Sequence, residues 1–401
     1  MPTDRDFDLV LVGATGFVGR LTAAHLARSA SPGARIALAG RNIDKLKAIQ
    51  KDLPKAAHHW PLLTVDVTDQ AQADDLAAKT TVVATTVGPY AAYGKQLIAA
   101  CAHAGTHYAD LTGEVLFVHD TIEKLHDVAQ ASGARIVNSC GFDSIPSDLG
   151  VMLAAQAAKA DDNGRLVDVT LHVRRAKGGF SGGTIDSMRQ QVMAMREDPS
   201  TRPIVANPDA LAAERTAYGK GPGPIGKDKS TGRWHGPFVM SSYNSRIVRR
   251  SWSLTQGDAP LLYDEVTDTG RGAKGAAVAY AVAAGTGAVI AAMATKPTRF
   301  VLDRLLPAPG EGPSKETREA GLFEIEVVAT TTNGSVYVAT VAAPFDPGYD
   351  GTAIMLGESA LALAAGEGTD RVGVITPATA LGDALVDRLR AHDFTLEVTT
   401  R

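Results

Sequence analysis

Spaced glycines near the start of the chain have the chemistry of a nucleotide-binding turn. An apolar run, Phe7 to Val12, leads directly into the glycines, and an Ala/Leu-rich helical pattern follows from Leu21 to Ala27. The first glycine permits a sharp turn, the second lets backbone N–H groups approach a pyrophosphate, and the third lets the helix pack closely on the sheet. The phosphates would lie at the positive end of that helix. We therefore expect these residues to bind a dinucleotide: Gly13, Thr15, Gly16, Phe17, Val18 and Gly19.

A cation follows the second predicted strand, Arg35 to Ala39, which completes a βαβ unit. An NAD site usually has an acidic residue here, which accepts hydrogen bonds from the ribose, whereas a 2′-phosphate requires a cation. The planar guanidinium of Arg41 can bind such a phosphate with two hydrogen bonds, and Arg20 and Lys45 are candidate helpers. We expect NADPH rather than NADH. The alternative is that Arg41 is a solvated arginine at a helix start.

The nicotinamide end is expected beside the fourth predicted strand, Thr81 to Thr85. A glycine and a proline follow this strand, and they let a ring approach the backbone without a side-chain clash. Tyr90 and Tyr93 come next, and each either donates a proton or is a packed aromatic residue. We assign Tyr90 to the catalytic group. The remaining cofactor contacts are expected from Asp66, Thr86, Gly88 and Pro89.

A second informative run, Asn138 to Asp148, follows the sixth predicted strand. Asp143 and Ser144 are candidates for substrate orientation or proton relay beside the nicotinamide. Ser147 or Asp148 is expected to cap the following helix. Cys140 is expected to be a small apolar filler, since no nearby residue in the sequence would lower the pKa of its thiol.

A polar cluster surrounds another strand end and contains His107, Tyr108, Asp110, Thr112 and Glu114. These side chains either hold substrate or, for Thr112 and Glu114, open the next helix. The 10 histidines show no metal-ligand spacing. We therefore expect no catalytic metal.

Alternating strands and helices must position these residues. Such alternation predicts an α/β fold with a doubly wound, Rossmann-type parallel sheet, whose ligands bind outside the carboxyl ends of the strands. A second α+β domain is indicated by later strand patterns and by Thr332-Asn333-Gly334, a hairpin signal. We expect the dinucleotide-binding domain to comprise residues 1–145, completed by 374–401, and the substrate domain to comprise 146–373. The strands expected in the first domain include Leu62 to Val65, His107 to Ala109 and Arg135 to Asn138.

Composition narrows the function classes. The 401 residues suffice for two domains, and a net charge of -4 from 40 basic and 44 acidic residues gives no field that favours nucleic acid. The 2 cysteines exclude a disulfide framework. The N-terminus has no signal-peptide pattern. A cytoplasmic protein is expected, which either stays in solution or lies at the inner face of the membrane.

One segment, Gly275 to Thr295, carries no charge and is rich in alanine and glycine. Its length suits a bilayer, but its few large apolar residues give a weak membrane preference. We expect a buried or groove-lining helix pair, broken near Gly285-Thr286-Gly287, rather than membrane contact. Thr298 to Leu306 is expected to be an amphipathic continuation. Residues 275–306 therefore either contact membrane lipid or line a substrate groove.

The chain resembles the saccharopine dehydrogenase-like superfamily, in the branch with the trans-acting enoyl reductases and the saccharopine dehydrogenase-like oxidoreductases. The matching segments extend over nearly the whole chain: GATGFVG at Gly13, AGR at Ala39, TTVGPYAAYG at Thr85, HYADLTGE at His107, GFDSIPSD at Gly141, SGGT at Ser181, PGEGPS at Pro309 and DPGYDGTA at Asp346. The resemblance implies NADPH-dependent reduction of an enoyl thioester carried by a polyketide synthase in lipid biosynthesis.

Two other functions stay open. A saccharopine-type amino-acid dehydrogenase would need a basic pocket for several carboxylates, for which Arg174, Arg175, Lys177 and Arg246 are the scattered candidates. A nucleotide-binding, lipid-associated protein without turnover is the other alternative. The oligomeric state is not indicated by the sequence.

Overall fold

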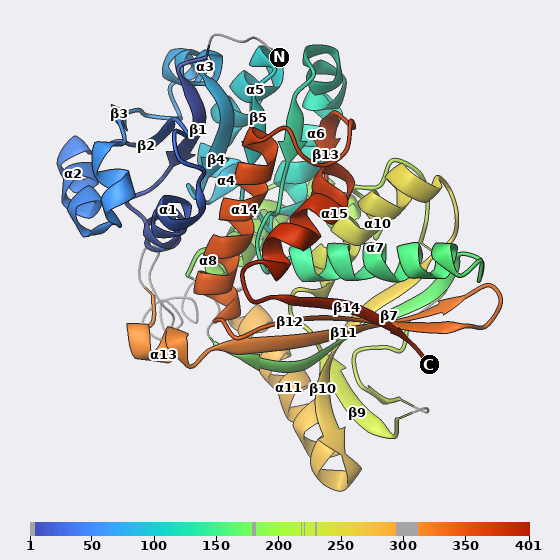
Figure 1. Ribbon diagram of the computed structural model, residues 1–401. Coiled ribbons are helices and arrows are strands. Elements are labelled where there is room, and N and C mark those ends of the chain that lie inside the picture. Colours follow the sequence, from blue (N-terminus) through green and yellow to red (C-terminus); the bar gives the residue numbers. More distant parts are fainter. Residues whose placement is uncertain (1–4, 179–181, 218, 220, 229–230, 294–311) are drawn as a thin grey trace.

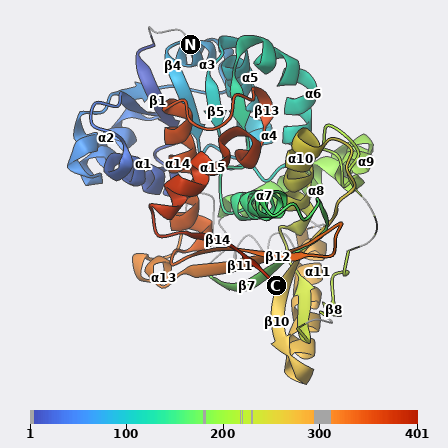
Figure 2. The ribbon, with the colours of Figure 1, turned by 45° about the vertical axis from the view of Figure 1, so that its right-hand side comes forward.

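The computed structural model describes residues 5–178, 182–217, 219, 221–228, 231–293 and 312–401. Two seven-stranded sheets, A and B, form the body of the molecule. Sheet A lies at the top of Figure 1 and sheet B below it, with helix α7 (Ile145–Ala160) between them. Figure 2 shows the same order of layers from a second direction.

Sheet A is parallel throughout, with the strand order β13-β6-β5-β4-β1-β2-β3. Its central strands are continuous apolar runs because helices cover both faces. The strand order reverses between β1 and β4, and parallel sheets bind ligands at such a reversal. The strands are β1 (Phe7–Val12), β2 (Ile36–Gly40), β3 (Leu62–Thr64), β4 (Thr80–Thr85), β5 (His107–Ala109), β6 (Arg135–Val137) and β13 (Gly373–Ile375).

Helices accompany the strands of sheet A as the alternating pattern predicts. The longest of them, α6, begins at Val115, directly after Glu114, which occupies its N-cap position. These helices are α1 (Phe17–Ser29), α2 (Ile43–Asp52), α3 (Gln70–Ala78), α4 (Tyr90–Tyr93), α5 (Lys95–Ala104), α6 (Val115–Ser132), α14 (Thr352–Ala364) and α15 (Pro377–Arg390), with a short 3-10 turn at Lys55–His59. The predicted Rossmann-type fold with a second α+β unit is confirmed.

Sheet B is mixed, with the order β14-β12-β11-β7-β10-β9-β8 and one parallel pair, β7 with β10. The predicted hairpin at Thr332-Asn333-Gly334 joins β11 to β12, and Gly334 has the positive φ of +82° that the tight turn requires. The strands are β7 (Leu166–Lys177), β8 (Gly226–Lys227), β9 (Arg233–Pro237), β10 (Leu262–Arg271), β11 (Leu322–Thr331), β12 (Val336–Ala343) and β14 (Thr395–Thr400).

Three helices of this second unit contact sheet B: α7 on its upper face (Figure 1), α10 at β10, and α11 at β9 and β10. At Gly150 an added Cβ would lie 2.7 Å from Val327 Cγ2, so a glycine lets α7 approach the sheet closely. The helices are α8 (Gly182–Glu197), α9 (Arg202–Ala206), α10 (Ser241–Gln256), α11 (Gly272–Met293) and α13 (Lys315–Glu319), with short turns at Pro199–Thr201 and Pro347–Gly351.

The last part of the chain is shared between the two sheets. We expected residues 374–401 to complete the first domain, and β13 does pair with β6 in sheet A. The final strand β14 pairs instead with β12 in sheet B. The domain boundaries at 145 and 373 stay a prediction.

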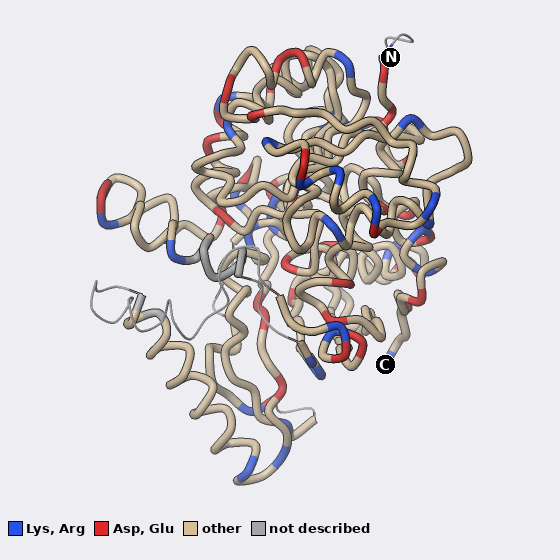
Figure 3. Tube along the Cα trace, turned by 90° about the vertical axis from the view of Figure 1, so that its left-hand side faces the viewer, with Lys and Arg blue, Asp and Glu red and all other residues tan. Residues whose placement is uncertain are grey.

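Helix α11 differs from the expectation for the uncharged segment. It is one continuous helix through Gly285-Thr286-Gly287, because the surrounding alanines favour helix strongly enough to carry it across two glycines. One face packs on β9, where Gly236 admits the backbone of Ala279, but most of the helix is exposed rather than buried. Figure 3 shows it projecting from the body, with Lys274 in its first turn and no charged residue between Gly275 and Met293. Thr298 to Leu306 lies outside the described residues.

No helix among the described residues is long and apolar enough to cross a membrane.

Candidate active site

The glycine turn after β1 has the geometry of a phosphate cradle. An added Cβ at Gly19 would lie 2.1 Å from the carbonyl oxygen of Gly13, so the helix can pack against the turn only with glycine there. At Gly16 the same test finds only that oxygen, at 3.4 Å, so this position faces open space. Gly16 caps α1, and no side chain caps its first N–H groups. These N–H groups fit a pyrophosphate.

The side chain of Phe17 anchors this turn to the lower part of the molecule. Its ring packs edge-on against Tyr349, with the centroids 5.0 Å apart, and the guanidinium carbon of Arg318 lies 5.5 Å from its centroid. Arg318 is held in turn by Asp350 at 2.5 Å. Phe17 can therefore offer only its backbone to a phosphate. Thr15 and Val18 are partly exposed beside it.

The 2′-phosphate position predicted at Arg41 lies at the carboxyl end of β2. Arg41 is exposed, and it is close enough to Asp66 to contribute to the lowered pKa of that carboxyl. Hydrogen bonds from the Thr68 hydroxyl and backbone are the larger causes of that lowering. An exposed guanidinium at this edge fits a ribose phosphate.

The turn after β4 is fixed to the glycine turn and to α6. The Thr86 hydroxyl donates to the Gly13 carbonyl at 3.1 Å. The buried Glu114 carboxylate accepts from the N–H groups of Tyr90 and Ala91, both at 2.8 Å. These bonds leave Gly88 exposed and Pro89 partly exposed at the edge of the sheet, where a ring of the cofactor is expected.

The side chain of Tyr90 is buried and hydrogen-bonded to the backbone. Its hydroxyl donates to the Thr85 carbonyl and accepts from the Leu111 N–H, each at 3.1 Å. Burial raises the pKa of this hydroxyl well above its usual value. The structure therefore favours the packed-aromatic alternative over the catalytic role that we assigned to Tyr90. Tyr93 is exposed to 42%.

A buried carboxylate, Asp110, joins the ends of β5 and β6. One oxygen accepts from the N–H groups of Ser139 at 2.9 Å and Thr112 at 3.0 Å. The other accepts from Asn138 Nδ2 at 2.8 Å and the Tyr108 hydroxyl at 3.1 Å. Burial raises the pKa of Asp110 to about 6 against these hydrogen bonds, which lower it. With four donors, this carboxylate positions its neighbours rather than reacting.

Ser139 and Tyr243 meet next to this carboxylate. Ser139 has a left-handed backbone, with φ of 67°, and its hydroxyl donates to the Thr112 carbonyl at 2.9 Å. Because that uses its one proton, the Tyr243 hydroxyl must donate to Ser139 Oγ, at 2.5 Å. Tyr243 comes from α10, and the sequence reasoning missed it. The apolar periodicity of α10 could have revealed the helix but not this contact.

Asp143 and Ser144 differ from Asp110 in having free polar atoms. Asp143 is partly exposed, no described residue donates a hydrogen bond to its carboxyl, and burial raises its pKa to about 6. Ser144 Oγ and Asn138 Oδ1 are buried and have no partner among the described residues. Among the described residues, polar atoms without a hydrogen-bond partner, and a carboxyl that accepts no hydrogen bond, are available to bind polar groups of a cofactor or substrate. Their catalytic roles stay a prediction.

The structure also bears on the expected helix cap and the expected role of Cys140 in the segment from Asn138 to Asp148. Neither Ser147 nor Asp148 caps α7, whose first residue is Ile145. Asp148 instead accepts from Ser251 and from the N–H of Ala378, at 2.8 Å, near the start of α15. Tertiary packing thus gives this carboxylate another helix end to cap. Cys140 is fully buried, as expected of an apolar filler, and burial raises the pKa of its thiol.

Comparisons with known proteins agree with this geometry. Residues 9–137 match the model of the saccharopine dehydrogenase NADP binding domain, so NADP(H) is the cofactor of this protein. A Mycobacterium tuberculosis protein, provisionally named a trans-acting enoyl reductase, is 44% identical over 99% of this chain and 98% of its own. A trans-acting enoyl reductase of Mycobacterium bovis is 41% identical over 97% of this chain and 96% of its own.

A solved structure shares the fold. Apo saccharopine dehydrogenase (L-Glu forming) from Saccharomyces cerevisiae matches with a TM-score of 0.54, covering 98% of this chain and 99% of that chain. The two sequences are 12% identical, so this likeness concerns the fold alone.

The exposed cation at the end of β2 generates the first prediction. Arg41→Asp should weaken NADPH binding by about ten- to a hundredfold, the scale of one to two charge-assisted hydrogen bonds, and should favour NADH in relative terms. Fluorescence titration of both cofactors measures this. Lys51→Asp, an exposed site with the same change in net charge, is the control. Equal affinity of the wild type for NADPH and NADH would contradict the assignment.

The open space at Gly16 leads to a second prediction, which concerns the position of the phosphates. Gly16→Val should leave the melting temperature nearly unchanged, because the added side chain meets little protein, yet abolish NADPH binding by occupying the phosphate position. Gly19→Ala is the opposite case and should lower the melting temperature, since its Cβ meets backbone. A Gly16→Val protein with wild-type NADPH affinity would show that the cofactor lies elsewhere.

Proposed function

Since the chain belongs to the trans-acting enoyl reductases of the saccharopine dehydrogenase-like superfamily, we propose that it reduces the α,β double bond of an enoyl thioester with NADPH. The protein is an NADP-dependent oxidoreductase. Bound NADPH supplies the hydride, and the protein supplies placement and electrostatics. The glycine turn and Arg41 are the residues that we propose to hold it.

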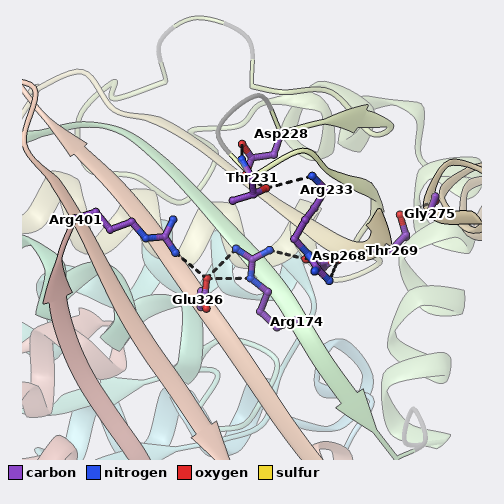
Figure 4. Close-up of polar contacts among 10 residues, drawn as sticks. Arg174, Asp228, Thr231, Arg233, Asp268, Thr269, Gly275, Glu326 and Arg401 are labelled. Carbon is purple, nitrogen blue, oxygen red and sulfur yellow. Dashed lines mark hydrogen bonds and ion pairs between the residues drawn. The ribbon is translucent and has the colours of Figure 1, made fainter. Parts of the chain in front are cut away.

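One observation supports the choice against a saccharopine-type dehydrogenase: Arg174 and Arg246, two of the four candidate cations, bind other groups of the protein. Figure 4 shows Arg174 between two carboxylates, at 2.5 Å from Asp268 and 2.8 Å from Glu326. Arg246 is buried and donates only to backbone carbonyls. Side chains held in this way do not form the basic pocket that a substrate with several carboxylates requires.

Arg175 and Lys177 do not change this conclusion. Both are exposed, and Arg175 lies 3.8 Å from Glu324 at the surface of sheet B. Exposed cations at the end of a strand bind a carboxylate weakly because water screens them.

The groups at the carboxyl end of β6 suit a neutral conjugated carbonyl. We assign the proton delivered to the α-carbon to the Asp143 carboxyl, whose raised pKa keeps part of it protonated near neutral pH. Ser144 Oγ, buried and without a described partner, is the donor that we assign to the thioester oxygen. Asp110 and Tyr243 position Ser139 and the loop that carries both groups.

The substrate that we propose is an acyl chain on the carrier domain of a polyketide synthase, as the word trans-acting in the names of the relatives suggests. This places the enzyme in lipid biosynthesis. A cytoplasmic location is consistent with the two cysteines, which are free and buried. Lipid contact by residues 275–306 stays a prediction. In the described part of that segment, α11 exposes Val278, Tyr280 and Val289.

The reaction is tested with carrier-bound or long-chain enoyl thioesters, since remote contacts supply binding energy that orients the alkene. We expect NADPH absorbance to fall and the saturated thioester to appear by mass spectrometry. No saturated product, together with NADP-dependent turnover of saccharopine, would transfer the assignment to the amino-acid dehydrogenase. Absence of any turnover despite NADPH binding would favour the non-catalytic alternative.

The raised pKa of Asp143 generates a pH prediction. If its protonated form donates the proton, kcat/KM should fall as the pH rises through about 6, because the acid loses its proton there. Asp143→Asn should lower turnover by about a hundredfold or more, remove this limb of the pH profile, and leave NADPH affinity nearly unchanged. Asp258→Asn, an exposed carboxyl, is the control. An unchanged pH profile in Asp143→Asn would assign the proton to another group.

A further inference from the structure

Two histidines and one glutamate from distant parts of the chain converge on the helices that cover sheet A. His25 comes from α1, Glu358 from α14, and His392 from the turn after α15. Both imidazole Nε2 atoms approach the same carboxylate oxygen, Glu358 Oε1, at 2.7 Å for His25 and 3.0 Å for His392. We propose that these three side chains bind a divalent cation of the zinc class, at a site separate from the candidate active site.

The ligand set is one that zinc uses. Two imidazole nitrogens and one carboxylate oxygen, with a water in the fourth position, form a common tetrahedral arrangement. The three ligand atoms lie within 4.8 Å of one another. His25 and Glu358 are buried, whereas 32% of the His392 side chain is exposed. The cluster is therefore closed on the protein side and open toward solvent on the His392 side, which leaves a path for the ion and room for a water.

The backbone makes room for this convergence. An added Cβ at Gly357 would lie 2.6 Å from Cδ2 of His25, so the imidazole reaches the carboxylate only because residue 357 is a glycine. The two imidazole rings stand edge-on, with their centroids 4.9 Å apart and an interplanar angle of 71°. Side chains of three separate segments are thus directed at one point.

A second layer of charge holds the carboxylate. Arg388 donates to the other oxygen of Glu358 at 2.9 Å, and Glu367 binds the same guanidinium through two bonds, at 2.7 and 2.9 Å. Outer partners of this kind orient a ligating carboxylate in metal sites. Two carboxylates face one guanidinium, so with neutral imidazoles the cluster carries a net negative charge. A divalent cation would compensate a negative charge that burial makes costly.

The competing arrangement is a hydrogen-bonded helix junction without an ion, in which both imidazoles donate to Glu358. The observed separations of 2.7 and 3.0 Å are hydrogen-bond lengths. Ligand atoms about 2.0–2.2 Å from a tetrahedral zinc lie about 3.3 Å apart, so ion binding requires the cluster to open by about half an ångström. Since His392 is partly exposed and follows the end of α15, it is the ligand that can move.

The experiment titrates zinc into the full-length protein after removal of metals with a chelator. We expect one zinc per chain by elemental analysis, competition with a chromophoric chelator at micromolar concentration or below, and a melting temperature that rises with zinc and falls with the chelator. Zinc affinity should weaken as the pH is lowered, because protons compete for the imidazole nitrogens.

Two variants of His392 separate the ion from the hydrogen bond. His392→Ala should lose the zinc response, with affinity at least tenfold weaker. His392→Gln keeps a donor for Glu358 and should recover the melting temperature of the metal-free protein without recovering the zinc response. His59→Ala, at an exposed position, is the control and should bind zinc normally. No stoichiometric zinc uptake by the wild type, or uptake unchanged in both His392 variants, would overturn the proposal.

Discussion

The buried carboxylate of Asp110 is the interaction on which the candidate site depends. It accepts hydrogen bonds from the Tyr108 hydroxyl in β5 and from three groups on the loops that leave β5 and β6. The loop after β6 carries the residues with free polar atoms. A buried charge is costly unless its lone pairs are satisfied, so the two loops must keep this arrangement for the carboxylate to stay buried. Asp143 and Ser144 are consequently presented on a rigid turn, although Asp110 contacts neither of them.

The same loop connects the two halves of the molecule. From Ser144 the chain passes directly into α7, which packs on sheet B through Gly150. A second contact between the halves lies at the glycine turn, where Tyr349 and Arg318 pack against the ring of Phe17. The glycine turn that we propose to bind the cofactor and the proposed proton donor are therefore both anchored to the layer around sheet B. A displacement of the layer around sheet B would therefore move both the glycine turn and the loop that carries Asp143.

Much of sheet A could be predicted, because its signals are local. Apolar runs of strand length, glycines at turn positions and helical periodicity between them are read over ten to twenty residues. The expected bounds of β5 were correct, and those of β3, β4 and β6 differed by one residue at an end. Residues 197–274 carried weaker signals, so α10 and the strands β8 to β10 were missed. The continuity of α11 was missed because glycines predicted a break that neighbouring alanines override.

The sequence alone determined the Rossmann-type fold, the glycine turn after β1 and the family, since each depends on residue types at fixed spacing along the chain. Only the tertiary structure decided which polar groups already bind other groups of the protein and which are free to bind a ligand. Tyr90 and Arg174 have the residue types of functional groups, yet both are held by the fold, at Thr85 and at Asp268 and Glu326. Tyr243 meets Ser139 from 104 residues away. A hydrogen-bond partner brought in by folding leaves no pattern in the local sequence, so reactivity had to be read from contacts.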